Sequence, residues 1–274
     1  NIEYQYIGKN TDSSNLLINS NYKNIKFQDS YFYFNENIKY SYDKEKKEFN
    51  IFQSKPGARA FFYKGLLKDI KINFNGYGEK LESELPNYPI DQRGLTGCLS
   101  LIHLVVKNIS IQSSKSTCED TVNLINVEGS LKEVNIIDSF RDGLDIDSSK
   151  IEIDYINILS SNNDCVDLSA GSYKLNKLNL INCGDKGLSV GEKSFLLLNE
   201  IVAENSNIGI ASKDSSVTKI NNAYLNNLET CVSAYNKKQE FYGGFLEIKN
   251  IDCKNYVHKT NSDVISKIII ENEL

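Results

Sequence analysis

A pattern of alternating apolar and polar residues recurs along the chain at a constant step of 22 residues. Its six copies begin at residues 120, 142, 164, 186, 208 and 230. The third position is always a branched aliphatic residue, namely Val122, Leu144, Val166, Leu188, Ile210 and Val232. The fifth position is also mostly apolar, whereas the fourth is mostly polar. Such alternation is typical of a strand with one buried face.

A second run of β-branched and aliphatic residues follows each of the first five copies, at 131–137, 151–159, 173–181, 195–203 and 217–225. A polar or small residue follows each run in the sequence at the same 22-residue step, namely Ser139, Ser161, Cys183, Asn205 and Asn227. The Ser and Asn side chains of this column are expected to hydrogen-bond from coil to coil. Two or three short strands per repeat, with no helical pattern, predict a parallel β-helix. The spacing of leucine-rich repeats does not recur. Because parallel crossovers are nearly always right-handed, we expect an all-β, right-handed, single-stranded parallel β-helix.

The repeat divides the chain into three parts of one elongated domain over residues 1–274. Residues 1–96 are expected to form irregular coils, with strands at 15–18 and 31–34, an exposed turn at 43–48, a coil at 59–76 and a long loop at 76–96. Regular coils are expected over 97–234. A projecting loop at 235–244 and a last strand at 264–270 complete the domain. The chain starts at Asn1 and has no Met, which indicates a mature form or a fragment of a larger protein.

Bulk composition narrows the possible partners. The net charge is −5, with 31 basic and 36 acidic residues, which argues against nucleic acid as a partner. No run of 18 apolar residues exists, so no transmembrane segment is expected, and no signal peptide is visible. The abundance of Asn, Lys, Ile and Ser is interpreted as a bias of base composition. The oligomeric state is not determined by these features.

The six cysteines form no Cys-x-x-Cys pair, which disfavours a zinc site. Cys165, Cys183 and Cys231 fall in the small or polar columns of the repeat. We favour buried free thiols, because cysteine is often buried in that form. The alternative is disulfides, which would imply an oxidising compartment.

Carboxylates gather where the first strands of two coils stack. Asp142 and Asp164 share one column, Asp145 and Asp167 share another, and Asp147 extends the group. Like charges one strand apart raise each other's pKa or require a cation. Asp142 and Asp164 can alternatively cap turns through backbone N–H groups, but capping does not explain the other three.

Basic residues follow the carboxylates along the same columns. Lys186 continues the column of Asp164, and Lys213 lies one coil higher. Arg141 is either an ion-pair partner or a substrate anchor. Asp185 and the loop residues Lys237 and Lys238 are further substrate-binding candidates, since loops that interrupt a solenoid often carry function. The two histidines, His103 and His258, are expected to be structural or exposed.

Three segments carry a resemblance to a known family. Residues 140–149 read Phe-Arg-Asp-Gly-Leu-Asp-Ile-Asp-Ser-Ser, residues 163–168 read Asn-Asp-Cys-Val-Asp-Leu, and residues 184–191 read Gly-Asp-Lys-Gly-Leu-Ser-Val-Gly. Over about residues 140–215 the chain resembles the polygalacturonase-type glycoside hydrolases, with motifs Asn-x-Asp-Gly, Asp-Asp-Cys, Gly-His-Gly-Leu-Ser-Ile-Gly and Arg-x-Lys. Those enzymes are right-handed parallel β-helices that hydrolyse galacturonan-like chains with carboxylates. Asp142, Asp164 and Lys213 match motif positions, whereas Phe140, Asn163, Asp185-Lys186 and Ala211 depart from them.

The two Asp-x-x-Asp pairs are also similar to the calcium-binding aspartates of some pectate lyases on the same fold. This similarity implies a calcium ion held by Asp142, Asp145, Asp164 and Asp167. Calcium neutralises a uronate and acidifies its C5 proton, and a lysine then removes that proton. Lys186 and Lys213, together with Asp164, are therefore the catalytic candidates. Elimination is favoured over hydrolysis, because Asn163 replaces one aspartate of the hydrolase pair.

Two classes of function follow. One is a polysaccharide lyase or glycoside hydrolase that acts on an acidic polysaccharide, with calcium as the only expected cofactor. The other is a non-catalytic β-helix of a cell-surface, adhesin or spike protein that binds glycan or only provides length. Either class is expected outside the cell or at its surface.

Overall fold

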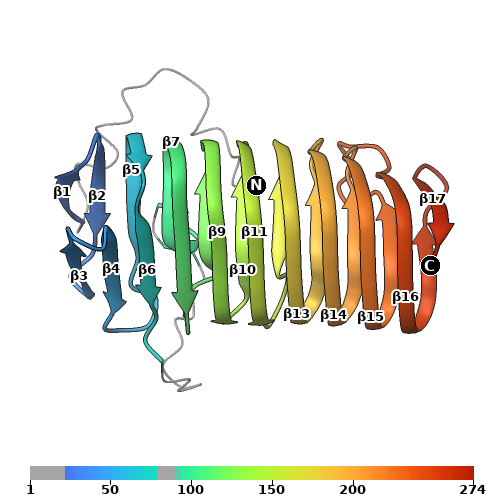
Figure 1. Ribbon diagram of the computed structural model, residues 1–274, viewed down its shortest axis with the longest axis horizontal. Coiled ribbons are helices and arrows are strands. Elements are labelled where there is room, and N and C mark those ends of the chain that lie inside the picture. Colours follow the sequence, from blue (N-terminus) through green and yellow to red (C-terminus); the bar gives the residue numbers. More distant parts are fainter. Residues whose placement is uncertain (1–21, 79–89, 92) are drawn as a thin grey trace.

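The chain folds into one row of stacked coils (Figure 1). The computed structural model describes residues 22–78, 90–91 and 93–274, and these residues contain no helix. Strands from β5 onward pair in parallel from coil to coil, and β4 also joins β6 in parallel. The predicted all-β parallel solenoid is therefore confirmed, and its right-handed sense stays a prediction. The strand expected at 15–18 lies outside the described residues.

The first seven strands build the N-terminal end and the first full coils. They are β1 (Lys23–Phe27), β2 (Ser30–Phe34), β3 (Ile38–Asp43), β4 (Glu48–Gln53), β5 (Ala60–Lys68), β6 (Lys71–Asn75) and β7 (Gly97–Ser114). The remaining coils are β8 (Asp120–Ile125), β9 (Glu128–Ser139), β10 (Asp142–Asp147), β11 (Lys150–Ser161), β12 (Val166–Ser169), β13 (Ser172–Gly191), β14 (Phe195–Lys213), β15 (Val217–Tyr235), β16 (Phe245–Ser262) and β17 (Lys267–Glu273). The turn expected at 43–48 and the coil at 59–76 are confirmed.

The repeating apolar positions form continuous columns inside the solenoid. The third-position column is wholly inaccessible to solvent at Val122, Leu144, Val166, Leu188, Ile210 and Val232. These residues are paired in register from strand to strand, as expected from the 22-residue step. Burying each such side chain stabilises the fold by about 1.5–3 kcal/mol. The columns therefore hold the first strands, and their outward side chains, at a fixed pitch.

The second strands bend at asparagines with left-handed backbone. Asn182, Asn205 and Asn227 have φ values of 59°, 57° and 54°, in a region that asparagine tolerates better than most residues. Their amides form a ladder, in which Nδ2 of each donates to Oδ1 of the previous one at 2.8 and 2.7 Å. Of the predicted column, Asn205 and Asn227 form such a ladder, whereas Oγ of Ser139 has no partner among the described residues and Cys183 is in a disulfide.

One predicted column was wrong in register. Cys183 pairs with Ser206 and not with Asn205. The step is 22 residues from Ser169 to Gly191 but 23 from Ser172 to Phe195, so the turn between these pairs holds one extra residue. The second strands are displaced by one position after that turn, although the first strands keep their spacing.

The expectation of free thiols was also wrong. All six cysteines form disulfides, which join Cys98 to Cys118, Cys165 to Cys183 and Cys231 to Cys253. Each bridge spans 18 to 22 residues, so its two ends lie within about one turn of the solenoid. A search for cysteines in the same column overlooks such pairs, because the partners lie in different columns.

The two ends of the solenoid differ. At the N-terminal end the antiparallel pairs β1–β2, β2–β5 and β3–β4 close the core. The rings of Phe32, Phe49 and Phe62 are wholly buried there, with centroids 4.8 to 5.2 Å apart. At the other end β17 begins at Lys267, three residues later than predicted, because the chain turns at Asp263 and Ser266.

Two segments interrupt the regular coils. Val217 pairs with Phe245, a step of 28 residues, so residues 236–244 form the expected insertion. Of the loop expected at 76–96, residues 79–89 and 92 lie outside the described residues, and the remainder contains no strand. No helix in the described part of the chain is long and apolar enough to span a bilayer.

Candidate functional site

Six aspartates are brought together by β8, β10 and the start of β12. This acidic patch consists of Asp120, Asp142, Asp145, Asp147, Asp164 and Asp167. Asp142 is paired with Asp120, and Asp145 with Asp167, across neighbouring parallel strands. Such strands are about 4.8 Å apart. The stacking that creates the core therefore also forces the carboxyl groups into proximity.

Asp142 and Asp164 each bind the backbone of the next coil. Oδ1 of Asp142 accepts hydrogen bonds from the amide of Asn163 at 2.6 Å and the backbone N–H of Asp164 at 2.8 Å. Oδ1 of Asp164 accepts from the backbone N–H of Lys186 at 3.1 Å. These contacts give both aspartates a structural role, which is the capping alternative considered for them from the sequence.

Lys186 is enclosed by carboxylates. Its Nζ lies 3.3 Å from Oδ1 of Asp164 and forms a second ion pair with Asp185, and its side chain is only 8% exposed. Burial opposes its charge, but Asp164 and Asp185 outweigh burial and raise its pKa above the usual value. Lys186 is therefore a charged, buried partner of Asp164, and Asp185 is part of the same ion-pair group.

Asp145, Asp147 and Asp167 have no such backbone contacts among the described hydrogen bonds and remain partly exposed. The amide of Asn123 donates to Asp145 and to Asp147, at 3.3 Å in each case. Nζ of Lys213 lies 3.7 Å from Oδ2 of Asp167. These three carboxylates form the accessible part of the patch.

Burial and mutual repulsion favour protonation of several patch carboxyls. Burial, with the charge of Asp164, raises the pKa of Asp142 to about 7. Burial, with the charge of Asp167, raises that of Asp147 to about 6. The pKa of Asp120 rises to about 8, chiefly by burial, and burial with several neighbouring carboxylates raises that of Asp145 well above its usual value. Near neutral pH the patch therefore contains both proton donors and carboxylates.

Lys213 reaches Asp167 from two coils away because Gly191 leaves room for it. A Cβ at position 191 would lie 2.8 Å from Cε and 3.1 Å from Cγ of Lys213. The sequence analysis singled out Lys213 but missed Gly191. The repeat places Asp147, Ser169, Gly191 and Lys213 in one column. The glycine one coil before Lys213 is the sequence feature that could have indicated room for the long lysine side chain.

Side-chain oxygens without partners mark the column of Asp145 and Asp167. Within the described part of the chain, Oγ of Ser100, Oδ1 of Asn123, Oδ1 of Asp167 and Oγ of Ser189 are buried and accept or donate no hydrogen bond. These residues occupy one column across five coils. Buried oxygens of this kind are normally satisfied by protein or water, so this row has hydrogen-bonding capacity that the neighbouring side chains do not use.

The turns on the C-terminal side border the patch. Lys238 forms an ion pair with Glu192, and both influence the pKa of Asp147. Oδ1 of the buried Asp214 accepts from the backbone N–H groups of Lys237 and Lys238, at 2.7 and 2.8 Å. The projecting loop is therefore fastened at this edge, and Lys237 is exposed on it.

The other sequence candidates lie apart from these contacts. Arg141 forms a 3.2 Å ion pair with Glu119 and is half exposed, so an ion-pair role is present and a substrate role stays a prediction. His103 contacts the amide of Asn126, and His258 is exposed.

Calcium was predicted at Asp142, Asp145, Asp164 and Asp167. No group of three or more His, Cys, Asp or Glu side chains within residues 22–78, 90–91 and 93–274 has the arrangement of a metal site. Oδ1 of Asp142 and of Asp164 is already engaged by backbone N–H groups. Asp145, Asp147 and Asp167 retain oxygens that suit a hard cation, so the residues fit calcium only in part.

Fold and patch together define a parallel β-solenoid with a carboxylate site on its stacked first strands. No protein family, curated protein or solved structure that was compared matches this chain.

Proposed function

We propose that this protein is a carbohydrate-active β-helix enzyme that hydrolyses an acidic polysaccharide, with Asp145 and Asp167 as its catalytic pair. The observation that carries the proposal is their pairing across β10 and β12 in different surroundings. Asp145 has a strongly raised pKa, whereas Asp167 faces Lys213. Glycoside hydrolysis needs such a combination of a protonated acid and a carboxylate.

The spacing favours a double-displacement reaction. Side chains paired on neighbouring strands lie on the order of 5 Å apart, which is the separation in retaining enzymes. Asp145 would protonate the leaving glycosidic oxygen while Asp167 attacks the anomeric carbon. Water would then cleave the glycosyl-enzyme, with Asp145 accepting its proton.

Hydrolysis fits these residues better than lysine-dependent elimination does. A lysine base must be neutral and reach the substrate. Lys186 and Lys213 are instead buried beside carboxylates, and the pKa of Lys186 is raised. A cation at Asp145, Asp147 and Asp167 remains compatible with elimination, so the role predicted for calcium is kept as a test.

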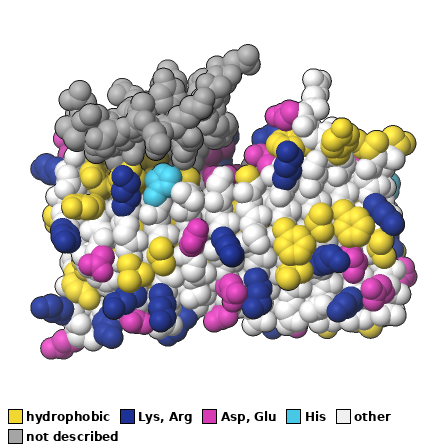
Figure 2. All heavy atoms as spheres, turned by 90° about the horizontal axis from the view of Figure 1, so that it is seen from above, with side chains coloured by type: hydrophobic (Ala, Val, Ile, Leu, Met, Phe, Trp, Pro, Cys, Tyr) yellow, Lys and Arg dark blue, Asp and Glu magenta, His cyan; other side chains and the backbone are white. Residues whose placement is uncertain are grey.

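Several features support an extracellular polysaccharide as the substrate. The three disulfides are typical of an oxidising compartment. Figure 2 shows basic and acidic side chains interspersed over the face that it presents, without a single-sign field suited to nucleic acid. Lys237 and Lys238 on the projecting loop can attract uronates to the edge of the patch.

The test is the release of new reducing ends from polygalacturonate and related polymers. Asp145→Asn and Asp167→Asn are each expected to lower turnover at least about 10²–10⁴-fold, because the first removes the general acid–base and the second removes the nucleophile. Asp29→Asn is the matched control, since Asp29 is exposed in the turn between β1 and β2, outside the patch. Full activity in both patch variants would refute the assignment. Binding without turnover by the wild type would support the non-catalytic, glycan-binding alternative.

A further inference from the structure

A second surface lies on the face made by the start of β11, β13, β14, β15 and β16. Three rows of outward side chains cross these strands along the axis of the solenoid. The apolar row contains Phe195, Val217 and Phe245, which are paired in register. The charged row lies two residues further along each strand and is interrupted on β14 by the exposed Leu197, and the amide row lies four residues further along and ends in Asp154 and Lys249.

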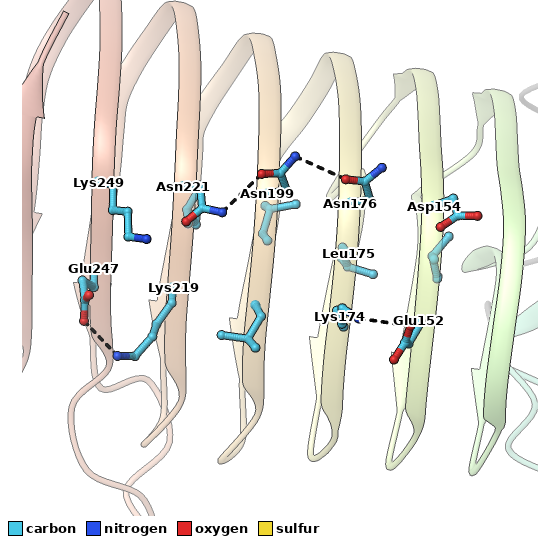
Figure 3. A pocket seen from close by; sticks show the side chains of 14 residues that line it. Glu152, Asp154, Lys174, Leu175, Asn176, Asn199, Lys219, Asn221, Glu247 and Lys249 are labelled. Carbon is cyan, nitrogen blue, oxygen red and sulfur yellow. Dashed lines mark hydrogen bonds and ion pairs between the residues drawn. The ribbon is translucent and has the colours of Figure 1, made fainter.

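The charged and amide rows enclose an open groove of about 630 Å³ (Figure 3). Its charges cancel, because three acids and three bases line it. Lys174 pairs with Glu152 at 3.3 Å, and Lys219 pairs with Glu247 at 3.1 Å. A face with no net charge, on which four of the six charges are paired, offers little attraction to a charged polymer.

The amide row is a ladder of three asparagines. Nδ2 of Asn199 donates to Oδ1 of Asn176, and Nδ2 of Asn221 donates to Oδ1 of Asn199, at 3.2 Å in both cases. Each amide has two N–H groups and two lone pairs on its oxygen, so the ladder leaves donors and acceptors available to hydroxyl groups. Figure 3 shows these side chains in one line across the strands.

The apolar row has a spacing that suits sugar rings. Phe195 is 39% exposed and Phe245 is half-buried, with Val217 between them. Two strand spacings separate the two rings, which amounts to about 9.6 Å. The disaccharide repeat of an extended β-1,4-linked glucan or chitin chain has nearly the same length, and every second ring of such a chain presents the same side.

We infer that this face is a binding platform for the surface of an insoluble, neutral β-1,4-linked polysaccharide. One glycan chain lies along the apolar row, and its hydroxyl groups meet the paired charges beside it. The amide row is four residues away along the strands, about 13 Å, and faces a neighbouring chain of the same polymer. The platform is separate from the acidic patch and does not depend on its chemistry.

The experiment is depletion of the full chain from solution by microcrystalline cellulose and by chitin. The wild type is expected to bind at least one of them, and a Phe195→Ala/Phe245→Ala variant is expected to bind at least tenfold more weakly. Tyr224→Ala is the matched control, because this tyrosine is equally exposed at 39% but lies on β15 beyond the three rows. Asp145→Asn should bind like the wild type, which separates the platform from the proposed catalytic site.

Three results would overturn the inference. The first is equal binding by the wild type and the double variant, and the second is that the wild type binds neither polymer. The third is a dimer of the wild type, seen by sedimentation, that the double phenylalanine variant converts to a monomer. That outcome would assign the face to contact between copies of this chain.

Discussion

At the scale of the residue, position in the coil decides what each aspartate does. Asp142 begins β10 and Asp164 lies two residues before β12, and one oxygen of each reaches a backbone N–H of the next coil. Asp145 and Asp167 stand three residues later on the strand, where the side chain meets other side chains. The same residue type therefore caps the backbone at one position and places two carboxyl side chains next to each other at another.

The raised pKa of Asp142 makes stability depend on pH. Its folded value of about 7 exceeds the unfolded value of 3.8, so the folded state binds the proton more tightly. This contribution is fully present below pH 3.8 and is lost as pH rises through about 7. The difference corresponds to about 4 kcal/mol at most.

Asp142→Asn keeps the hydrogen-bonding oxygen but cannot ionise. We expect the variant to match the wild type near pH 4 and to be more stable above pH 7, as measured by urea unfolding at several pH values. Asp154→Asn, on the exposed face of β11, should show no such difference. A variant that is less stable than the wild type at pH 9 would show that the carboxylate form of Asp142 is stabilising.

Gly191 offers a test of how Lys213 is placed. A methyl group there meets the flexible stem of Lys213, so Gly191→Ala should displace the ammonium from Asp167 without unfolding the chain. We expect about a tenfold loss of turnover, which corresponds to about 1.4 kcal/mol, with a small change in Tm. Lys213→Met should have a similar effect, and the double variant should lose little more, because both changes remove one interaction. Additive losses would contradict this account.

At the scale of the element, the disulfides tie neighbouring parts of a coil together. Cys165 precedes β12 and is joined to Cys183 within β13. The bridge therefore closes a loop over residues 165–183, which lies between Asp164 and Lys186 in the sequence. A bridge of this kind restricts the unfolded chain more than the folded one. It therefore stabilises the coils that carry the patch.

Replacing Cys165 and Cys183 together by serine should lower the free energy of unfolding by about 2–4 kcal/mol. Urea unfolding measures this change, and the Cys231–Cys253 pair, on β15 and β16 beyond the patch, is the matched control. Thiol titration of the unfolded wild type without reductant should detect no free thiol. Six reactive thiols in that titration would contradict the disulfide assignment.

The elements also show what the sequence can and cannot predict. Val122 and its equivalents revealed the first strands, because a buried face imposes a strict period. The sequence analysis did not detect the single extra residue before Phe195. The first strands keep their 22-residue period, and only the second strands are shifted. The three disulfides were not predicted for a related reason. Each joins two cysteines that lie in different columns of the repeat, so comparing residues within one column does not pair them.

Composition concealed one structural role as well. The abundance of asparagine was interpreted as a base-composition bias, but Asn182, Asn205 and Asn227 adopt the left-handed backbone at bends and connect coils through their amides. The sequence located Asp145 and Asp167 in the patch. It could not show which aspartates the backbone engages, because that depends on side-chain direction at the start of each strand.

At the scale of the whole molecule, the solenoid separates its surfaces. The stacked first strands carry the acidic patch, and the stacked second strands carry the apolar, charged and amide rows. A β-solenoid repeats each surface position at every coil, so a polymer with a similar repeat can make the same contact several times. This property links the architecture to polysaccharide as the proposed partner for both surfaces.

The most direct test of the central claim is the product formed by the wild type from polygalacturonate and related acidic polysaccharides, with and without calcium. The account predicts new reducing ends without the ultraviolet absorbance of unsaturated uronates, and abolition of that activity by Asp145→Asn. Unsaturated products would assign the patch to elimination. Absence of any cleavage over the whole panel would contradict a catalytic role for the acidic patch.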